Sequence, residues 1–151
     1  MSRDSVPVID LRGFTSASRA ARDRFVQTLG DALFDTGFFS LVGHGVSVEL
    51  IDKAYEVAKR FFDLPADAKA KYEIKNGKGQ RAFTSFGKEH AKDKAAPDLK
   101  EFWHVGQEIS PDHPLHAKYP ANIWPSETPE FKTVMLEMFR QMNLCAMKLL
   151  D

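Results

Sequence analysis

The sequence predicts an α+β fold that is rich in helices and carries short strands. Three stretches, residues 19–36, 48–62 and 128–151, repeat apolar residues with helical spacing. Two short apolar segments, residues 6–11 and 38–42, have the length and composition of strands. With 151 residues, 43% of them hydrophobic, the chain is long enough for one domain with one core.

The first part of the chain predicts a strand, a helix and a second strand. Residues 6–11 alternate apolar and polar side chains, and residues 12–18 are small and polar, which is typical of a loop. Residues 19–36 form the first helix, which Gly37 ends, and residues 38–42 form a strand expected to be buried on both faces. The apolar face of the helix carries Phe25, Val26, Leu29 and Leu33.

The middle of the chain predicts two helices and then irregular structure. Ser47 caps a helix over residues 48–62, and Pro65 fits the first turn of a short helix that ends near Tyr72. Residues 74–97 are the least regular. Residues 98–106 are expected to form a strand, and prolines make residues 110–127 a loop.

The last predicted helix opens at Thr128-Pro129-Glu130, an N-cap followed by proline and an acid. Its apolar stripe consists of Phe131, Met135, Met138, Met142, Cys145 and Leu149. Because this stripe continues to Asp151, we expect a further segment, a partner or a second copy of the chain to cover it.

Composition argues against several classes of function. Lys plus Arg and Asp plus Glu each total 21, so the formal net charge is zero and no general attraction to nucleic acid or anionic lipid is expected. Residues 69–100 hold nine basic and four acidic residues, but no nucleic-acid-binding motif. No apolar run suits a membrane span or a signal peptide, and the single cysteine permits no intrachain disulfide, so a cytoplasmic location is predicted.

The order of motifs resembles a known family. The strings "VPVIDL", "GFFSLVGHGV", "FFDLP", "KGQRAFTSFGKE", "DLKEFWHVG" and "NIWP" are similar to the N-terminal half of the isopenicillin N synthase-like Fe(II)/2-oxoglutarate-dependent dioxygenases. The resemblance implies a non-haem dioxygenase N-terminal domain over residues 1–110, the proline-rich loop 111–127 and the long helix 128–151. It also implies that the short strands would join a double-stranded β-helix (jelly-roll) core, which we expect this chain to lack.

His44 lies between two glycines in "VGHGV", where a metal ligand, a catalytic base or a turn residue are all conceivable. In the family that the sequence resembles, this Gly-His-Gly is a structural turn. The residues favour the same interpretation, because glycines on both sides permit a tight turn and no ligand-like residue is adjacent.

The family holds its iron with His-x-Asp/Glu and a distant second histidine, a pattern that the sequence lacks. Two positions after His44, His90, His104, His113 and His116 stand Val46, Lys92, Gly106, Leu115 and Lys118. The segment Asp112–His116 gathers ligand-like residues, but we interpret it as a solvated loop. We therefore predict no catalytic and no metal-binding residue in this chain, and no bound Fe(II) or 2-oxoglutarate in the chain alone.

Two residues are predicted to contact substrate in the intact enzyme. Arg81 matches the arginine that contacts a substrate carboxylate in isopenicillin N synthase, and its bidentate guanidinium suits that role. Phe83 stands two positions after it, where related members often have a tyrosine. Phe83, Phe86 and Trp103 are alternatively core aromatics, which is the more usual fate of large aromatic residues.

Two functions therefore stay open. In the first, the chain is the N-terminal part of an oxidoreductase that uses Fe(II) and 2-oxoglutarate on a small-molecule substrate. In the second, it is a complete non-catalytic module that dimerises or docks on a partner through its last helix. Neither identifies the substrate, and isopenicillin N synthase itself dispenses with 2-oxoglutarate.

Overall fold

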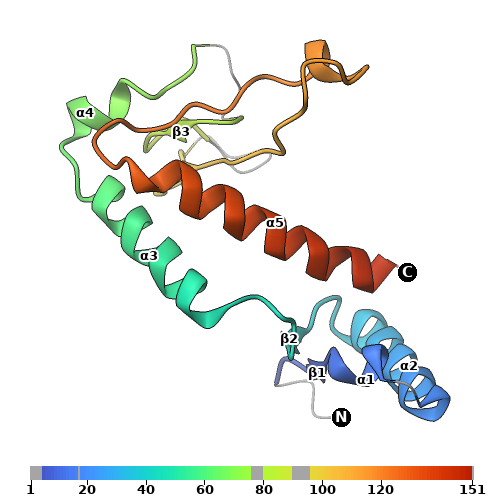
Figure 1. Ribbon diagram of the computed structural model, residues 1–151. Helices are drawn as coiled ribbons and strands as arrows, with labels where there is room; N and C mark the ends of the chain where they lie inside the picture. The colour runs from blue at the N-terminus through green and yellow to red at the C-terminus, as the bar shows by residue number, and fades with distance from the viewer. Residues whose placement is uncertain (1–4, 17, 76–79, 90–95, 151) are drawn as a thin grey trace. The chain divides into compact units, whose positions relative to one another are not determined.

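The computed structural model describes residues 5–16, 18–75, 80–89 and 96–150. Its contacts divide the chain into two compact units, Met1–Gly45 and Val46–Asp151, which are the blue-to-cyan and the cyan-to-red parts of Figure 1. The domain bounds predicted from the sequence do not include this division, and they stay predictions. Among the described residues, no helix combines the length and hydrophobicity that a transmembrane span requires.

The first unit is built around a pair of parallel strands. Strand β1 (Val8–Asp10) pairs with β2 (Ser40–Val42), with Ile9 opposite Leu41. Parallel strands need a crossover connection, which helix α2 (Arg19–Asp35) supplies. The predicted strand, helix and strand are therefore confirmed.

Two details of this unit differ from prediction. Residues 12–18 were expected to be a loop, but Arg12–Thr15 form the short helix α1, because the Phe14 and Thr15 amides both donate to the Leu11 carbonyl. The predicted burial of both faces of residues 38–42 is wrong, since Phe38 is 59% exposed and only Leu41 within β2 is partly covered. A two-stranded sheet has too few neighbours to cover both faces.

Helix α2 has the predicted extent but a shifted buried face. The Ser18 hydroxyl caps it by accepting from the Ala21 amide at 3.4 Å, and Gly37 follows it with φ of 79°. Phe25 and Ala32 are buried, whereas Leu33, expected on the apolar face, is exposed. The contact side of the helix therefore centres on Phe25 and Ala32.

The second unit is organised by two long helices. Helix α3 (Val48–Phe62) has the predicted bounds, and Ser47 caps it as expected, accepting from the Leu50 amide at 3.2 Å. Helix α4 (Ala66–Ala70) follows, with Pro65 at its N-cap rather than inside its first turn. Helix α5 (Glu130–Leu150) packs along α3, as Figure 1 shows.

An aromatic core fills the space between these helices and a short strand pair. Strand β3 (Phe83–Thr84) lies antiparallel to β4 (Phe102–Trp103), which is far shorter than the strand predicted over residues 98–106. Phe61 is fully buried at the centre of the core, with ring centroids of its aromatic neighbours 4.7–5.9 Å away. The core contains Val57, Phe61, Phe83 and Phe131, with Phe62, Tyr72, Trp103 and Trp124 packed against it.

Only the beginning of the α5 stripe is buried. Phe131 is fully buried and Met135 packs against the core, but Met142 is 55% exposed. Met138, Cys145 and Leu149 are partly buried. The described residues of the stripe thus contribute to the core chiefly through the first turns of α5.

The connection from β4 to α5 runs through residues 104–129. It is irregular, as predicted for residues 110–127, except for the single 3-10 turn η1 (His116–Lys118). The described residues form only two two-stranded sheets, β1–β2 and β3–β4, in an α+β arrangement.

Candidate functional site

The described residues do not fit an iron site. No group of three or more His, Cys, Asp or Glu side chains in this part of the chain is placed to hold a metal ion. His90, one of the five histidines, lies outside the described residues.

His44 lies between two glycines whose backbone conformation fits the predicted turn. Gly43 and Gly45 have φ of 62° and 78°, the left-handed region that glycine adopts without strain. A Cβ added at Gly43 would also clash with the carboxylate of Asp10 and approach the Arg12 side chain. The glycines are thus required by backbone geometry and close packing, which supports the turn interpretation.

The segment Asp112–His116 uses its side chains to shape a loop. His113 Nδ1 accepts a hydrogen bond from the Leu115 amide at 3.1 Å, and His116 Nδ1 donates to the Ile109 carbonyl at 3.0 Å. The Ser110 hydroxyl donates to Asp112, which lowers the pKa of that carboxyl. All five residues of the segment are exposed, as expected for a solvated loop.

Arg81 has an unusual backbone and a fixed side chain. Its φ of 62° is the one positive value among the described residues other than glycine. The guanidinium donates from Nη1 to the Gln107 carbonyl at 2.6 Å and lies 5.5 Å from the centre of the Tyr119 ring. A Cβ at Gly106 would collide with this guanidinium, so the glycine provides the space that the arginine occupies.

Neighbouring backbone segments hold Arg81 in place. The Ile123 amide donates to the Arg81 carbonyl at 3.1 Å. The Asn122 side chain then joins this segment to Gly106 through two hydrogen bonds, accepting from its amide at 2.9 Å and donating to its carbonyl at 2.8 Å. The guanidinium therefore lies in a scaffold fixed from two sides.

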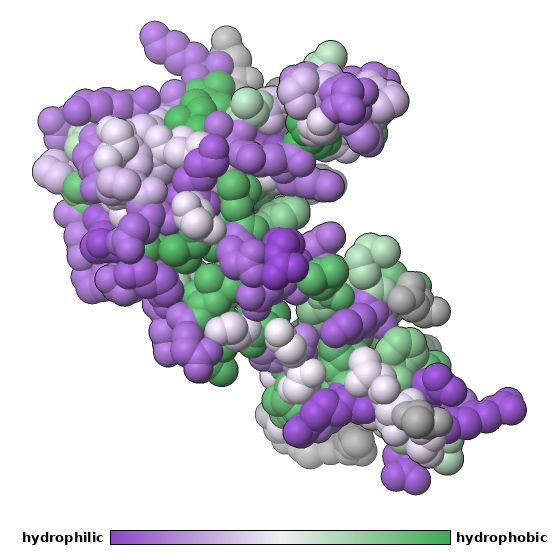
Figure 2. Space-filling model, in the orientation of Figure 1, coloured by the Kyte–Doolittle hydropathy of each residue, from purple (hydrophilic) through white to green (hydrophobic). Residues whose placement is uncertain are grey.

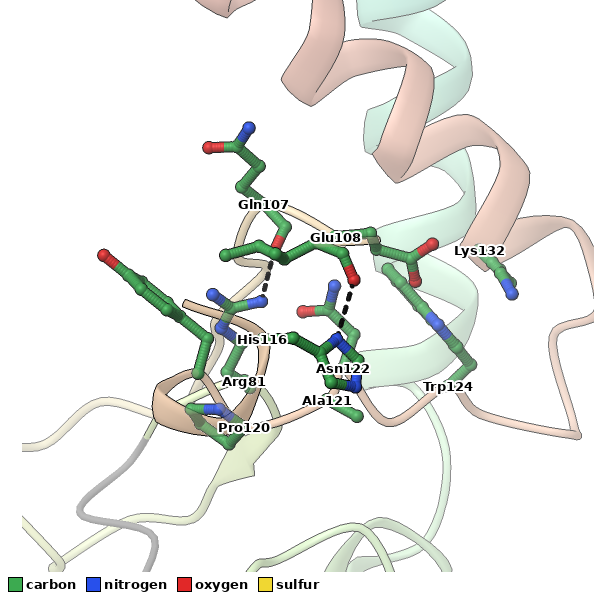
Figure 3. Close-up of a pocket in the computed structure, with 11 residues that line it drawn as sticks. Arg81, Gln107, Glu108, His116, Pro120, Ala121, Asn122, Trp124 and Lys132 are labelled. Carbon is green, nitrogen blue, oxygen red and sulfur yellow. Dashed lines mark hydrogen bonds between the residues drawn. The ribbon is translucent and has the colours of Figure 1, made fainter. Parts of the chain in front are cut away.

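Arg81 lines a pocket of about 300 Å³ within the second unit. In Figure 3, Arg81 and Pro120 lie at one end, Lys132 at the other, and His116, Asn122 and Trp124 between them. Arg81 stands two positions before the start of strand β3, the β4–α5 connection supplies most of the wall, and the first turn of α5 supplies Lys132. The pocket thus collects residues that lie far apart in the sequence.

The charges lining the pocket favour an anion. Arg81 and Lys132 are cationic, and Glu108 is the one carboxylate among the lining residues. None of these three forms an ion pair with another of the residues that the structure describes. A small anionic group would therefore find a positive potential and unused hydrogen-bond donors here.

Phe83, the second predicted substrate contact, is only 3% exposed and belongs to the aromatic core. Its centroid lies 5.6 Å from that of Phe61, and Trp103 occupies the same core. The alternative prediction of a core aromatic is confirmed for these two residues, but is wrong for Phe86, which is 57% exposed. The role of Phe83 as a substrate contact stays a prediction.

Comparison with known proteins decides the family. Residues 6–127 match the family model described as non-haem dioxygenase in morphine synthesis N-terminal. The chain belongs to this family. The predicted resemblance to the N-terminal region of Fe(II)/2-oxoglutarate-dependent dioxygenases is confirmed.

Individual relatives support the same family assignment. The 2-oxoglutarate-dependent dioxygenase caaD of Aspergillus niger is 32% identical over 142 residues, which cover 92% of this chain and 44% of that protein. The validamycin A dioxygenase of Streptomyces hygroscopicus subsp. limoneus is 32% identical, with coverages of 94% and 40%. The chain thus spans less than half the length of these relatives.

Solved structures support the fold. A 2OG-Fe(II) oxygenase family protein from Caulobacter crescentus superposes with a TM-score of 0.81 at 32% identity, covering 97% of this chain and 46% of that one. A full-length Neurospora crassa protein in complex with alpha-KG superposes with a TM-score of 0.76 at 22% identity, with coverages of 95% and 44%. The second likeness concerns the fold alone.

Sequence reasoning found Arg81 but missed the rest of the pocket. Asn122 and Trp124 belong to "NIWP", which contributes only to the family resemblance, and no pattern in the sequence singles out Lys132. The prolines and aromatics of residues 119–125 are the one local signal that this segment has a defined conformation.

Proposed function

We propose that this chain is the N-terminal part of an oxygenase that uses O2 to oxidise a small molecule while 2-oxoglutarate is decarboxylated to succinate and CO2. The observation that carries the proposal is the family match over residues 6–127. It is supported by relatives that are themselves 2-oxoglutarate-dependent dioxygenases. A cytoplasmic location is part of the same proposal.

Iron and 2-oxoglutarate would bind outside the residues described here. Within them no ligand set for iron exists, so this part of the enzyme would act on substrate rather than on the metal. Arg81 is the residue that we propose for this task, since its guanidinium is half-buried, fixed and lines a pocket. Its partner would be a carboxylate of the substrate.

The first test is an anaerobic titration of the 151-residue chain with Fe(II) and 2-oxoglutarate, followed by visible absorption. We expect no charge-transfer band, because no three His, Cys, Asp or Glu side chains among the described residues are grouped to hold a metal ion. A stoichiometric band would contradict this assignment, and His113 and His116 would be substituted first. In the matching test, the longest reading frame that encodes this sequence is expressed and succinate formation is measured. We expect succinate from the product of that reading frame and none from the 151-residue chain.

A second candidate function is a module that associates with another copy of this chain through α5. It is favoured by exposed apolar side chains on the distal half of this helix, namely Met142, Leu144, Met147 and Leu150. Figure 2 shows further hydrophobic patches between the hydrophilic residues on the face that it draws. Light scattering tests this second candidate, because self-association through α5 requires the mass of a dimer. Replacing Met147 and Leu150 by lysine should return the mass to that of a monomer.

A further inference from the structure

Among the residues that the structure describes, the guanidinium of Arg81 has no carboxylate partner, unlike several other arginines. Arg12, Arg60 and Arg140 each form an ion pair with Asp or Glu. Arg81 instead donates one hydrogen bond to a backbone carbonyl, and no other hydrogen bond from its guanidinium reaches a described residue. Since a guanidinium carries five N–H donors, most of its capacity is unused.

This cation is placed at a conformational cost. A positive φ in a residue other than glycine is unfavourable and persists where the surrounding structure enforces it. Here Gly106 supplies the space, and Asn122 fixes Gly106 from both its amide and its carbonyl. A strained backbone, a matched glycine and a guanidinium that has no carboxylate partner among the described residues together indicate a group prepared for a ligand.

The other walls of the pocket suggest the body of that ligand. Trp124 is half-buried against Phe131, with ring centroids 6.4 Å apart, and it lines the pocket between Arg81 and Lys132 (Figure 3). An indole is a flat apolar surface suited to another ring. The volume of about 300 Å³ lies at the small end for ligand pockets, so the ligand is small.

We propose that the pocket binds an aromatic carboxylate: its carboxylate accepts hydrogen bonds from Arg81 and its ring lies in contact with Trp124. Lys132 adds electrostatic attraction from the far end of the pocket. This inference rests on the proposed substrate contact of Arg81 and narrows the substrate class from any small molecule to a planar acid.

Benzoate is the probe, with benzamide as its neutral isostere and cyclohexanecarboxylate as its non-aromatic counterpart. Binding to the 151-residue chain is followed by NMR through the indole N–H signals of Trp124 and Trp103, the two tryptophans. Trp103 lies in the core and serves as the internal reference. No iron or 2-oxoglutarate is added, so the result is independent of oxygenase chemistry.

We expect the Trp124 signal to shift and saturate with a dissociation constant of about 1 mM, as suits a ligand of this size. Benzamide and cyclohexanecarboxylate should each bind about tenfold more weakly, and the Trp103 signal should stay in place. The proposal is overturned if benzoate fails to saturate by about 20 mM, if benzamide binds equally well, or if both tryptophan signals shift alike. If cyclohexanecarboxylate binds as tightly as benzoate, the proposal that the ligand is aromatic is wrong.

Gly106→Ala is the sharpest variant, because the three atoms nearest to the added methyl all belong to the Arg81 side chain, while every charge in the pocket is kept. Benzoate affinity should fall at least about tenfold with the fold retained by circular dichroism. Gly30→Ala is the matched control, since a Cβ there meets nothing within 4 Å. Unchanged affinity in Gly106→Ala would contradict the proposal.

Arg81→Asn removes the guanidinium but tolerates the positive φ, so it separates loss of the ligand contact from backbone strain. It should abolish detectable benzoate binding and lower the melting temperature only slightly, through loss of the hydrogen bond to the Gln107 carbonyl. Binding that survives would overturn the role of Arg81. If benzoate binds but the product of the longer reading frame forms no succinate, the proposed function is wrong and the ligand proposal is retained. If succinate forms but benzoate does not bind, the proposed function is retained and the aromatic carboxylate is wrong.

Discussion

The two units use similar elements but distribute their buried side chains differently. In residues 46–151, rings from both long helices and both short strands converge on Phe61. In residues 1–45, Phe25 has one aromatic neighbour, Phe14 at 5.5 Å, and the remaining buried side chains among the described residues are aliphatic. The second unit therefore concentrates its stability in one cluster, whereas the first relies more on backbone pairing and turns.

The largest expected effect is at the centre of that cluster. Phe61→Ala should lower the free energy of unfolding by about 5 kcal/mol and Phe25→Ala by about 3 kcal/mol, because the larger contact set leaves the larger cavity. Urea denaturation measures both. Trp103 and Trp124 lie in the second unit, so their fluorescence reports on it alone, while far-ultraviolet circular dichroism reports on both units.

Two outcomes would change this comparison. Equal losses for Phe61→Ala and Phe25→Ala would mean that the cluster is no more important than a single aromatic pair. Coincident transitions by fluorescence and circular dichroism in both variants would show that the two units unfold as one cooperative system.

The next effect concerns backbone geometry in the first unit. Gly43→Ala should destabilise by about 1 to 3 kcal/mol, because alanine is strained at φ of 62° and its methyl meets Asp10. Gly30→Ala, inside α2, should instead stabilise by roughly 0.5–1 kcal/mol. Circular dichroism melts measure both, and a neutral Gly43→Ala would show that the turn around His44 relaxes without cost.

Helix caps provide a matched pair across the two units. Ser47→Ala should cost about 1 kcal/mol and Ser18→Ala about 0.5 kcal/mol, since the Ser47 bond is shorter and its helix packs on the core. Urea midpoints by circular dichroism measure the difference. A larger loss of stability in Ser18→Ala than in Ser47→Ala would contradict this prediction, because the cap in the first unit would then contribute more than the cap in the second.

Local signals explain which parts of the fold could be predicted. The bounds of α3 follow from a capping serine and helical periodicity, both contained in consecutive residues. Strand β4 was predicted too long because a strand ends where its partner ends, and β3 offers only Phe83 and Thr84. Helix α1 was not predicted because its four residues are too few to show helical periodicity.

The candidate site was less predictable for a related reason. Arg81 could be found through its family position, but its contacts with Gln107 and Ile123 join residues 26 and 42 positions away. The need for glycine at 106 arises only when the Arg81 side chain crosses it. Such a requirement exists in three dimensions and leaves no periodic trace in the sequence.

The smallest expected effects are electrostatic, and again one carboxylate in each unit can be compared. Glu130 accepts from Arg60 at 2.5 Å and pairs with Lys53 at 3.4 Å, joining α5 to α3, and these contacts lower the pKa of its carboxyl, chiefly through Arg60. Hydrogen bonds from Arg12 likewise lower the pKa of Asp10. The Asp10 contact spans only two residues.

A lowered pKa in the folded state means that the charged pair stabilises the protein above the ordinary carboxyl pKa, and that this contribution is lost as the pH falls through the folded value. Stability measured by tryptophan fluorescence should therefore decline below about pH 4.5, and less steeply in Glu130→Gln. Asp10→Asn should leave that slope unchanged, because Asp10 lies in the unit without tryptophan. If Glu130→Gln and the unsubstituted chain show the same slope, this ion pair is too solvated to contribute, and the attachment of α5 to α3 rests on the packing of Phe131.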